Sequence, residues 1–452
     1  MKKKLLLSLL VLYVAPILIF AQVQVGEDIL SPGDGTILGL SLDEDGTRVA
    51  IGTPLYDGVR GKVVVYSYNG SDWIQTGQEI IGETPTDFTG FSIDLNASGN
   101  RLIVGSFTHN VNQGRTVVYD YNGTNWVQVG STIFGSGPSD SGRSVSISDS
   151  GTVIAVGEPG TNNSTGRVRT YDFDGNDWII KGQALSGLEE GSQFGFSLDI
   201  NDGGDRIVVG SLKYQGSIRM FEFDGNSWNP LGQVVYGDVM DDHLGEFVSI
   251  SSGGFRVAAG APLNDSAGEG HGLVRVYDYD GQEWQAVGQD ITGPNGDSRL
   301  GRVSLTDSGN ALVAGNTNQS VGGALIYEFE NNQWVDKAQL SDAFAIAFNG
   351  NGSRLAAAGF ELTRIYDLSG VLGIVDNNSR DFSIYPSPTT GLLYVESEAS
   401  IVKIDVFNVL GSLLLSSTNK SVIDISHLNA GVYIVRIQNE HSNIVIKRVV
   451  KR

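Results

Sequence analysis

The residues best suited to chemistry in this sequence are carboxylates and histidines that lie close together between positions 241 and 271. Imidazole nitrogens and carboxylate oxygens are mixed ligands that hold divalent metals in many proteins. No recognised ligand spacing connects these residues, so we favour the simpler interpretation of acidic loops exposed to solvent. The candidates for a ligand-binding face are Asp241, Asp242, His243, Asp265, Glu269, His271 and, further away in the chain, His109.

Motifs of known catalytic chemistry are missing from the sequence. The patterns G-x-S-x-G and H-E-x-x-H, the phosphate-binding loop and a dinucleotide-binding strand–helix unit do not occur. Because the chain has no Cys, it has no thiol nucleophile and no thiolate zinc site. Two of the five histidines, His427 and His441, lie near the C-terminus. These features predict a protein that is not an enzyme.

A repeat organises most of the chain. All six Trp fall in one register, 50 to 56 residues apart. An aromatic segment such as Val63–Tyr68 precedes each Trp, and Asn-Gly or Asp-Gly separates the two in five repeats, with Asn331-Asn332 in the sixth. This pattern predicts antiparallel strands joined by two-residue type I′ turns. The six residues are Trp73, Trp126, Trp178, Trp228, Trp284 and Trp334.

A second hairpin lies upstream of each aromatic segment, and it occurs seven times rather than six. Its first copy comprises Leu40–Leu42, a turn at Asp45-Gly46 and Arg48–Gly52. The seventh repeat ends at Tyr366 without a fourth strand. The other turns of this kind lie at 98–99, 150–151, 203–204, 253–254, 308–309 and 351–352.

The N-terminal segment can supply the missing strand. Val25–Ile29 is similar to Val287–Ile291, with Gln22 at the position of a Trp. We therefore predict an all-β ring over residues 22–370, a seven-bladed β-propeller closed by an N-terminal strand that lies beside Arg364–Tyr366. The repeated Trp and Tyr are expected to pack between blades rather than to stack against sugars.

The topology of such a ring distinguishes two faces. Short hairpin turns lie on one side, and the longer loops, where binding residues usually lie, are on the other. The long-loop side collects the three histidines of the ring and many carboxylates, so we expect it to bind a cationic or metal-bridged partner and to repel nucleic acid. These carboxylates are Asp57, Glu83, Asp87, Asp140, Glu158, Glu189, Glu190, Asp241, Asp242, Asp265, Glu269 and Asp297.

Segments such as Phe194–Ser197 and Val257–Pro262 are similar to the FG-GAP repeats of integrin-α-type propellers. Members of that family often bind calcium between the first and second strands through a D-x-D-x-D-G-x-x-D pattern. Asp94, Asn96 and Ser98 keep possible oxygen ligands, but no closing Asp follows, and an Arg lies nearby in five repeats. We therefore expect plain hairpin turns, with Ca²⁺ or another divalent cation as the alternative.

The chain begins with a segment typical of export. Lys2–Lys4 are basic, Leu5–Phe20 are apolar, and Ala21 follows. The apolar run is shorter than the ~20 residues of a membrane span. It predicts a cleaved signal peptide over residues 1–21 rather than an uncleaved anchor.

A second domain follows the ring. The formal net charge is −21, but residues 371–452 hold 8 Lys and Arg against 7 Asp and Glu, so the acid is concentrated in the ring. Residues 371–380 have the composition of a linker. From residue 381 to 452, alternating apolar residues separated by Gly and Asn turns predict a small antiparallel β-sandwich.

This second domain resembles the type A C-terminal sorting domain of the type IX secretion system. The family's Y-P-N-P-x-x-G motif is matched by Tyr385–Gly391, with Ser387 in place of Asn. The resemblance implies passage through the outer membrane, usually with removal of this domain and often with glycolipid anchoring. An ordinary accessory sandwich that stays attached is the alternative. The motif residues are Tyr385, Pro386, Pro388, Gly391, Gly431, Tyr433 and Lys447.

These features predict a secreted or surface-displayed binding or adhesion module at the outer membrane of a Gram-negative bacterium. Its expected partners are the type IX secretion machinery and an extracellular protein or glycan, with no integral membrane span once the signal is removed. The alternatives are a propeller-fold hydrolase or lyase acting on extracellular glycans, a passive structural surface protein, and a ring without a ligand of its own.

Overall fold

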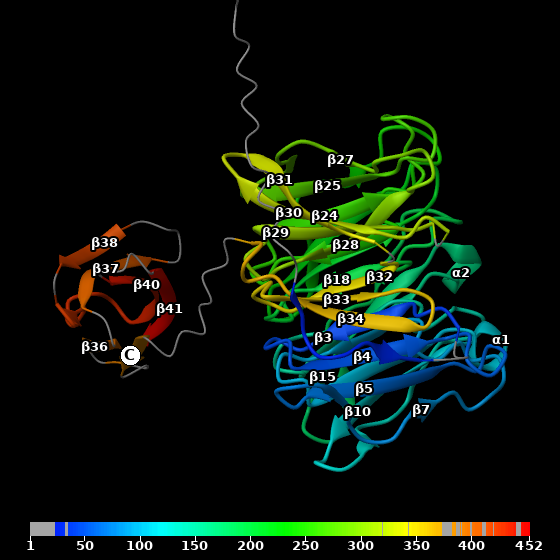
Figure 1. The fold of residues 1–452 in the computed structure, drawn as a ribbon, viewed down its shortest axis with the longest axis horizontal. Coiled ribbons are helices and arrows are strands. Elements are labelled where there is room, and N and C mark those ends of the chain that lie inside the picture. Colours follow the sequence, from blue (N-terminus) through cyan, green and yellow to red (C-terminus); the bar gives the residue numbers. More distant parts are fainter. Residues whose placement is uncertain are drawn as a thin grey trace, which may run out of the picture.

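The computed structural model describes residues 23–31, 35–318, 320–341 and 343–372 and, in the C-terminal part, 382–385, 389, 391–397, 400–408, 413–418, 420–439 and 444–452. The predicted signal peptide, Gln22 and residues 373–380 of the predicted linker lie outside this range. The described chain is all-β, with two four-residue helical turns, α1 (His109–Asn112) and α2 (Thr161–Ser164) (Figure 1). Neither described helix has the length and hydrophobicity needed to cross a membrane.

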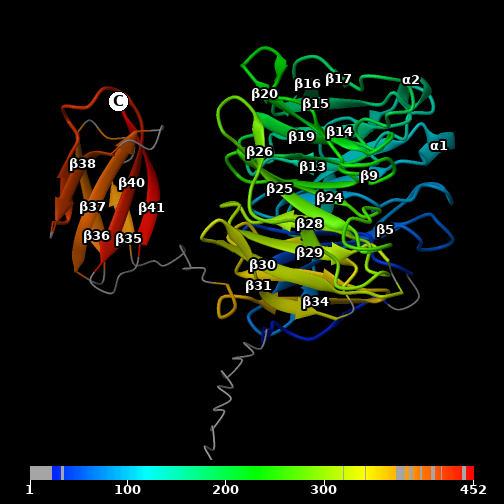
Figure 2. The same cartoon turned by 90° about the horizontal axis from the view of Figure 1, so that it is seen from above.

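Within this range, seven antiparallel sheets make up residues 23–372, which we call the seven-sheet body (Figure 2). The first sheet contains β3 (Gly39–Leu42), β4 (Arg48–Thr53), β5 (Lys62–Tyr68), β6 (Trp73–Gln75) and β7 (Ile80–Ile81). The second contains β8 (Ile93–Leu95), β9 (Arg101–Ser106), β10 (Arg115–Tyr121), β11 (Trp126–Gln128) and β12 (Ile133–Phe134). The third contains β13 (Val145–Ile147), β14 (Val153–Glu158), β15 (Arg167–Phe173), β16 (Trp178–Ile180) and β17 (Leu185–Ser186).

The remaining four sheets repeat this plan. The fourth contains β18 (Leu198–Ile200), β19 (Arg206–Ser211), β20 (Ser217–Phe223), β21 (Trp228–Pro230) and β22 (Val235–Tyr236). The fifth contains β23 (Phe247–Ile250), β24 (Arg256–Ala261), β25 (Leu273–Tyr279), β26 (Trp284–Ala286) and β27 (Ile291–Thr292). The sixth contains β28 (Leu300–Leu305), β29 (Ala311–Asn316), β30 (Ala324–Glu330) and β31 (Gln333–Leu340). The seventh contains β32 (Ala345–Phe348), β33 (Arg354–Ala358), β34 (Leu362–Asp367), β1 (Val23–Gln24) and β2 (Ile29–Leu30).

The turns between third and fourth strands differ from the predicted type I′ turns. Asn69 opens a four-residue loop, 69–72, in which only Gly70 has a positive φ. The Oδ1 of Asn69 accepts hydrogen bonds at 2.9 Å from the backbone N–H groups two and three residues later. The same Asn or Asp contact recurs in the next four repeats, so the prediction is wrong there because the side-chain oxygen closes the turn. Only the divergent repeat, at Asn331-Asn332, places two consecutive residues at positive φ.

The repeated Trp residues pack between sheets. Each lies at or next to the start of a fourth strand and is 2–7% exposed. Each ring lies 4.9–5.4 Å from a Tyr or Phe ring of the third strand. The indole N–H of Trp126 donates to the Thr76 carbonyl of the preceding sheet at 2.9 Å, and the other indoles reach the preceding sheet at 2.7–3.2 Å. Each Trp therefore ties its sheet to the one before it.

The opening segment pairs with the last strand of the repeat, as predicted. Gln24 lies opposite Tyr366 in the β1–β34 ladder, and the N–H of Val25 donates to the Ile365 carbonyl at 2.8 Å. The carbonyl of Val25 accepts the indole N–H of Trp73 at 2.8 Å. The predicted position of this segment is therefore confirmed.

A glycine after the fourth-strand segment leaves room for the next indole. Gly77 has a φ of +77°, and a Cβ there would lie 2.7 Å from Cδ1 of Trp126. Gly26 has a φ of +73°, and a Cβ there would lie 2.8 Å from Cδ1 of Trp73. Gly26 thus occupies the position of Gly77 in the repeat. It lies near the N-terminus, whereas the other strands of its sheet, the seventh, come from residues 345–367.

Arginine at the start of the second strand gives a second link between neighbouring sheets. Nη1 of Arg48 donates to the Gly99 carbonyl in the hairpin turn of the next sheet at 2.7 Å. The equivalent arginines of three further sheets do the same at 2.5–2.9 Å. Arg354 of the seventh sheet donates to the Gly46 carbonyl of the first sheet at 2.7 Å. The same type of contact therefore leads from the seventh sheet back to the first.

The contact between the sixth and seventh sheets is built differently. Leu368, Val371 and Leu372, which follow β34, are buried in a core that includes Ile326 and Leu340 of the sixth sheet. These apolar side chains provide the packing at the one contact for which the repeat has no Trp. Val371 and Leu372 were predicted to lie in the linker, but the structure places them in this core.

The described residues between 382 and 452 form two further antiparallel sheets. Residues of both sheets, such as Val395 and Val435, share one hydrophobic core, as in two packed layers. One sheet contains β35 (Phe382–Tyr385), β36 (Leu392–Ser397) and β39 (Val422–Asp424). The other contains β38 (Leu413–Thr418), β37 (Ile401–Asn408), β40 (Gly431–Asn439) and β41 (Ile444–Lys451).

We predict that Ile29→Ala lowers the free energy of unfolding by about 2–4 kcal/mol, because Ile29 is 4% exposed and loses core contacts. The matched control is Leu30→Ala. Leu30 is the next residue of β2 but is 64% exposed, so its truncation should change the free energy by less than about 0.5 kcal/mol. Urea unfolding followed by Trp fluorescence measures both. Deletion of residues 22–30 should destabilise more than either, and an unchanged midpoint would contradict the pairing.

Candidate functional site

The loops between second and third strands and the connections between sheets form what we call the long-loop face, which carries α1 and α2 (Figure 1). In α1, Asn110, Val111 and Asn112 have positive φ angles of 49–63°. Val111 is 85% exposed, and this backbone conformation is costly for a β-branched residue. The Asn112 carbonyl accepts two backbone hydrogen bonds at 2.8 Å from the following connection, which hold the loop in place.

His109 belongs to the packing of this face. Its Nδ1 lies 3.0 Å from Oδ1 of Asp87, which is fully buried. Asp87 also accepts backbone hydrogen bonds from Glu83 and Thr84 at 2.7 and 3.0 Å. Although burial opposes ionisation, the hydrogen bonds from Thr84 and His109 lower the pKa of Asp87. This pair therefore fixes two loops together.

Asp241, Asp242 and His243 face different partners. Asp242 is buried, and its Oδ2 accepts hydrogen bonds at 2.9 Å from two backbone N–H groups of the preceding turn. His243 Nδ1 lies 3.2 Å from Oε2 of Glu246, and this contact raises the pKa of His243. Asp241 is exposed. The three side chains do not converge on one point.

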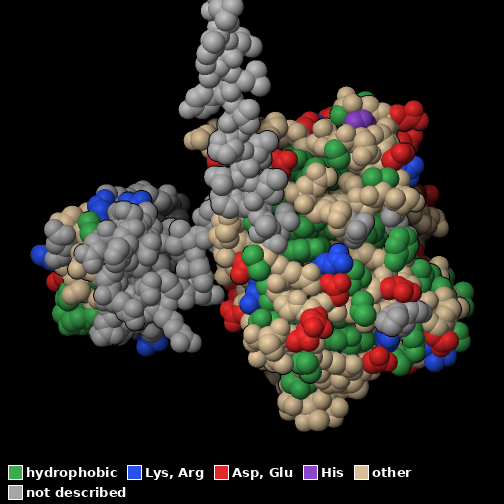
Figure 3. Space-filling view, in the orientation of Figure 1, with side chains coloured by type: hydrophobic (Ala, Val, Ile, Leu, Met, Phe, Trp, Pro, Cys, Tyr) green, Lys and Arg blue, Asp and Glu red, His purple; other side chains and the backbone are tan. Residues whose placement is uncertain are grey.

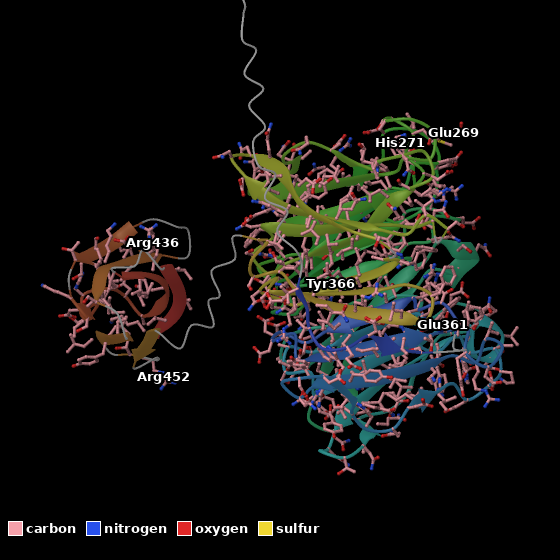
Figure 4. All side chains as sticks on the ribbon, in the orientation of Figure 1. Glu269, His271, Glu361, Tyr366, Arg436 and Arg452 are labelled. Atoms are coloured by element: carbon pink, nitrogen blue, oxygen red, sulfur yellow. The ribbon has the colours of Figure 1, made fainter. Side chains whose placement is uncertain are left out.

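Asp265, Glu269 and His271 share the loop between β24 and β25, and Figure 4 shows Glu269 and His271 near its tip. Oδ1 of Asp265 accepts from the N–H of Gly270 at 2.7 Å, which closes the loop on itself. Nδ1 of His271 lies 2.7 Å from the Gly293 carbonyl. Among the residues that the structure describes, no group of three or more His, Asp or Glu is arranged to hold a metal ion.

The long-loop face is less acidic at its surface than its sequence suggests. Glu158 is fully buried and forms ion pairs with Arg167 and Arg169. Asp87 and Asp242 are also buried. In Figure 3 the long-loop face lies at the right-hand edge, and carboxylates are scattered over the side of the seven-sheet body that faces the viewer. Fewer carboxylates are therefore available to bind a cationic or metal-bridged partner than the sequence indicated.

Asp94, Asn96 and Ser98 serve sheet contacts. Oδ1 of Asn96 accepts from the first N–H of the second strand at 2.8 Å, and its Nδ2 donates to Oγ of Ser98 at 3.0 Å. The oxygens of Asp94 instead accept from Oγ of Ser41 and from the N–H of Ile147, each at 3.0 Å, in the two neighbouring sheets. The three side chains thus have separate roles within the hairpin and between sheets.

Asp94 belongs to a set of polar residues on the first strands whose role between sheets our sequence analysis missed. Asp199 makes the equivalent contact, accepting from the N–H of Ile250 in the next sheet at 3.0 Å. Oγ of Ser146 lies between the two carboxylates, 3.2 Å from Asp94 and 3.0 Å from Asp199. Burial raises the pKa of Asp94 to about 7, with Asp199 adding to the shift, and that of Asp199 to about 6. The sequence signal that could have revealed this set is a Ser or Asp that recurs between two apolar residues of the first strand.

Four carboxylates gather at the opposite ends of these strands, in the hairpin turns. They are Glu44, Asp149, Asp202 and Asp307, whose turns are linked by backbone hydrogen bonds such as Asp149 N–H to the Asp202 carbonyl at 3.2 Å. Burial, together with the neighbouring carboxylates, raises the pKa of Asp307 to about 9 and that of Asp202 to about 7. Asp307 therefore keeps its proton at neutral pH and donates it to Glu44.

Exposed apolar side chains gather on the long-loop face beside the fourth sheet, and our sequence analysis did not single them out. They are 48–65% exposed. The Tyr214 carbonyl accepts from the Asp241 N–H at 2.9 Å, which places the 239–240 turn beside Tyr214. A cavity of about 40 Å³ makes the surface concave. We call this surface the loop patch; it consists of Leu188, Tyr214, Tyr236, Val239 and Met240.

Several residues of the predicted sorting motif lie in or next to the C-terminal sheets. The hydroxyl of Tyr433 donates to the Asn429 carbonyl at 2.7 Å, and the Gly391 carbonyl accepts from the Ile425 N–H at 2.7 Å. Gly431 begins β40. Tyr385 and Lys447 lie in β35 and β41, whereas Pro386 and Pro388 lie outside the described residues.

Residues 383–452 match the family described as the secretion system C-terminal sorting domain. The match covers the two C-terminal sheets and confirms the predicted sorting signal of the type IX system. The protein is therefore secreted or associated with the outer-membrane surface, and this domain implies contact with the type IX secretion machinery. No curated protein matches the chain. The resemblance of residues 23–372 to FG-GAP repeats stays a prediction.

We predict that stability falls as pH rises toward 9 and that Asp307→Asn reduces this dependence. The folded pKa of Asp307 is raised, so the folded chain holds a proton that the unfolded chain loses above about pH 4. The stabilisation is complete below that pH and is lost as pH passes about 9, with a slope of about 1.4 kcal/mol per pH unit for one proton. The Asn side chain still donates to Glu44 but cannot ionise.

Melting temperatures from pH 5 to pH 9 measure this effect. The control is Asp45→Asn, an exposed residue of the same turn as Glu44, which should keep the slope of the unmodified protein. Equal slopes for Asp307→Asn and the unmodified protein would contradict the assignment.

We predict that deletion of residues 383–452 leaves the protein in the periplasm, because the type IX machinery then lacks its signal. Cell fractionation and protease accessibility on intact cells measure the location. As a control, residues 373–452 fused to an unrelated exported protein should direct it to the cell surface or the medium. Unchanged surface exposure after the deletion would show that another segment carries the signal.

Proposed function

We propose that residues 23–372 are a seven-bladed β-propeller of FG-GAP-like repeats, closed by β1 and β2, that serves as a non-enzymatic binding or adhesion module outside the cell. The repeated contacts support the ring. The indole and arginine links that join successive sheets also join the seventh sheet to the first. The first strands of neighbouring sheets are also in contact around the whole series, since β3 of the first sheet contacts β8 of the second sheet and β32 of the seventh. Contacts that return to their starting point fit a closed circle of blades.

The observation that carries the binding function is the loop patch. Contiguous exposed apolar side chains on a soluble protein mark interaction surfaces. Tyr and Met supply contact area that adapts to a partner. Charged groups border the patch, including the ion pair of Lys213 with Glu189 at 3.0 Å. An apolar centre with a polar rim suits an extracellular protein as the partner.

The polar groups near the first strands favour binding over hydrolysis. A glycoside hydrolase needs two carboxyl groups flanking its substrate at a defined separation. Asp94 and Asp199 each accept a backbone hydrogen bond from the next sheet, so both are used in holding sheets together. The described lining of the large cavity on the long-loop face includes a single carboxylate, Glu246.

The export route supports a role outside the cell. The sorting domain brings the chain across the outer membrane. We propose that the domain is then removed within the part of the predicted linker that follows the core, 373–380, and that the ring remains at the surface or is released. In either case the loop patch can meet partners in the extracellular space.

We predict that the double substitution Val239→Ser and Met240→Ser lowers binding to the protein partner by about tenfold or more, because both side chains are 60% exposed and the apolar area that they would bury against the partner is lost. The partner is identified by applying the purified ring to arrays of extracellular proteins and glycans. The control is Ile179→Ser with Ile180→Ser, which removes two equally exposed apolar residues from the outer edge of the third sheet. Equal loss in both variants, or binding only to glycans, would contradict the role of the loop patch.

A further inference from the structure

A cavity of about 620 Å³ opens on the long-loop face where the first strands begin. This volume is typical of sites for small molecules. Its wall combines aromatic and charged side chains from residues at or just before the start of the first strands of successive sheets. They include Phe91, Arg143, Phe196, Glu246, Arg302 and Phe344.

The two arginines are clamped between aromatic rings. The guanidinium of Arg143 lies 4.2 Å from the ring centre of Phe91 and 4.0 Å from that of Phe196. Arg302 lies 4.3 Å from Phe344 and 4.8 Å from Phe247. Rings at these distances attract the guanidinium charge without accepting a conventional hydrogen bond, so the N–H groups of each arginine can still serve a ligand.

Nε of Arg302 is buried without a hydrogen-bond acceptor in the described chain. The carboxylate of Glu246 attracts both guanidinium groups through its charge, and that of Asp140 attracts Arg143. The arginines that link sheets are paired, as Arg101 is with Asp120 at 2.6 Å and Arg256 with Asp278 at 2.6 Å. Burial lowers the pKa of both cavity arginines to about 10, so they stay cationic at neutral pH. Both side chains are half-buried, and a guanidinium that has lost part of its hydration without gaining a hydrogen-bonded carboxylate is costly, which makes the cavity receptive to an anion.

The geometry points to a binding site for a small carboxylated molecule, with its carboxylate held by Arg143 and Arg302 and its body against the surrounding Phe rings. Planar guanidinium groups bind planar carboxylates through two parallel hydrogen bonds. Apolar residues such as Val145 and Leu198 line the cavity beside the arginines. This proposal does not depend on the loop patch.

The expected ligand has the opposite charge to the partner predicted from the sequence. The ring as a whole is acidic, but the described cavity wall holds three arginines, Arg143, Arg299 and Arg302, against the single carboxylate of Glu246. That carboxylate lies 3.2 Å from Nδ1 of His243, a contact that raises the pKa of His243. The local field at the cavity is therefore positive within an acidic molecule.

The test uses residues 22–452, the chain without its predicted signal peptide, with three sodium carboxylates as probes: acetate, benzoate and D-glucuronate. Thermal shift and isothermal titration calorimetry are run at constant ionic strength, with D-glucose and benzamide as neutral counterparts and sodium sulfate as a non-planar oxyanion. We expect at least one carboxylate to raise the melting temperature and to bind, whereas its neutral counterpart does not. No response to any carboxylate, equal binding of the neutral counterpart, or a response to sulfate alone would overturn the proposal.

Substitutions locate the site. Arg143→Gln and Arg302→Gln should each weaken binding by about tenfold or more, the size expected for a charge-assisted hydrogen bond. Glu246→Gln should strengthen binding, a gain that misfolding cannot produce. The control Lys213→Gln removes a cation of the same face that does not line this cavity and should leave affinity unchanged. Carboxylate binding that survives both arginine substitutions would overturn the assignment, and none of these results depends on whether the loop patch binds a protein.

Discussion

The hydrogen bond from each Trp indole to the preceding sheet is the contact on which the rest of this structure depends. A four- or five-stranded sheet cannot bury both faces alone, so each sheet needs neighbours on both sides. The indole provides apolar area for packing and a single N–H that must find an acceptor. Because that acceptor is a backbone carbonyl of the adjacent sheet, the same group fixes both the distance and the register between sheets. At Trp73 the acceptor is Val25, so this contact also brings together the two ends of the repeat.

Because the chain has no Cys, these contacts between sheets contribute more to stability than they would beside disulfides. An exported protein without disulfides must rely on its core and on polar links between sheets for stability. The arginines at the second strands provide such links through carbonyls of the next hairpin turn. Where the repeat lacks a Trp, between the sixth and seventh sheets, Leu368 and Leu372 pack instead. Different side chains thus meet the same requirement for burial.

The first strands show how one repeated backbone can carry different chemistry along its length. At the long-loop end, guanidinium and phenyl groups line a cavity that is locally positive. Further along, Asp94 and Asp199 accept backbone hydrogen bonds from the next sheet. At the hairpin end, carboxylates crowd together and Asp307 keeps its proton. The sequence repeat fixes where these side chains lie, and the residue types at each copy decide what they do.

The amino-acid sequence was sufficient to determine the strand pattern, the Trp register, the pairing of Val25–Ile29 beside Tyr366 and the sorting domain, because each depends on local periodicity or on a contiguous motif. It misjudged the turn at Asn69, where a side-chain oxygen closes the loop. Only the tertiary structure decided which polar groups are available for binding. In the sequence, Glu158 and Asp242 cannot be told apart from exposed acidic residues, yet both are buried. Arg143 and Arg302 are far apart in the chain, yet both line one cavity. Burial and charge compensation arise from neighbours in other sheets, and no local pattern records them.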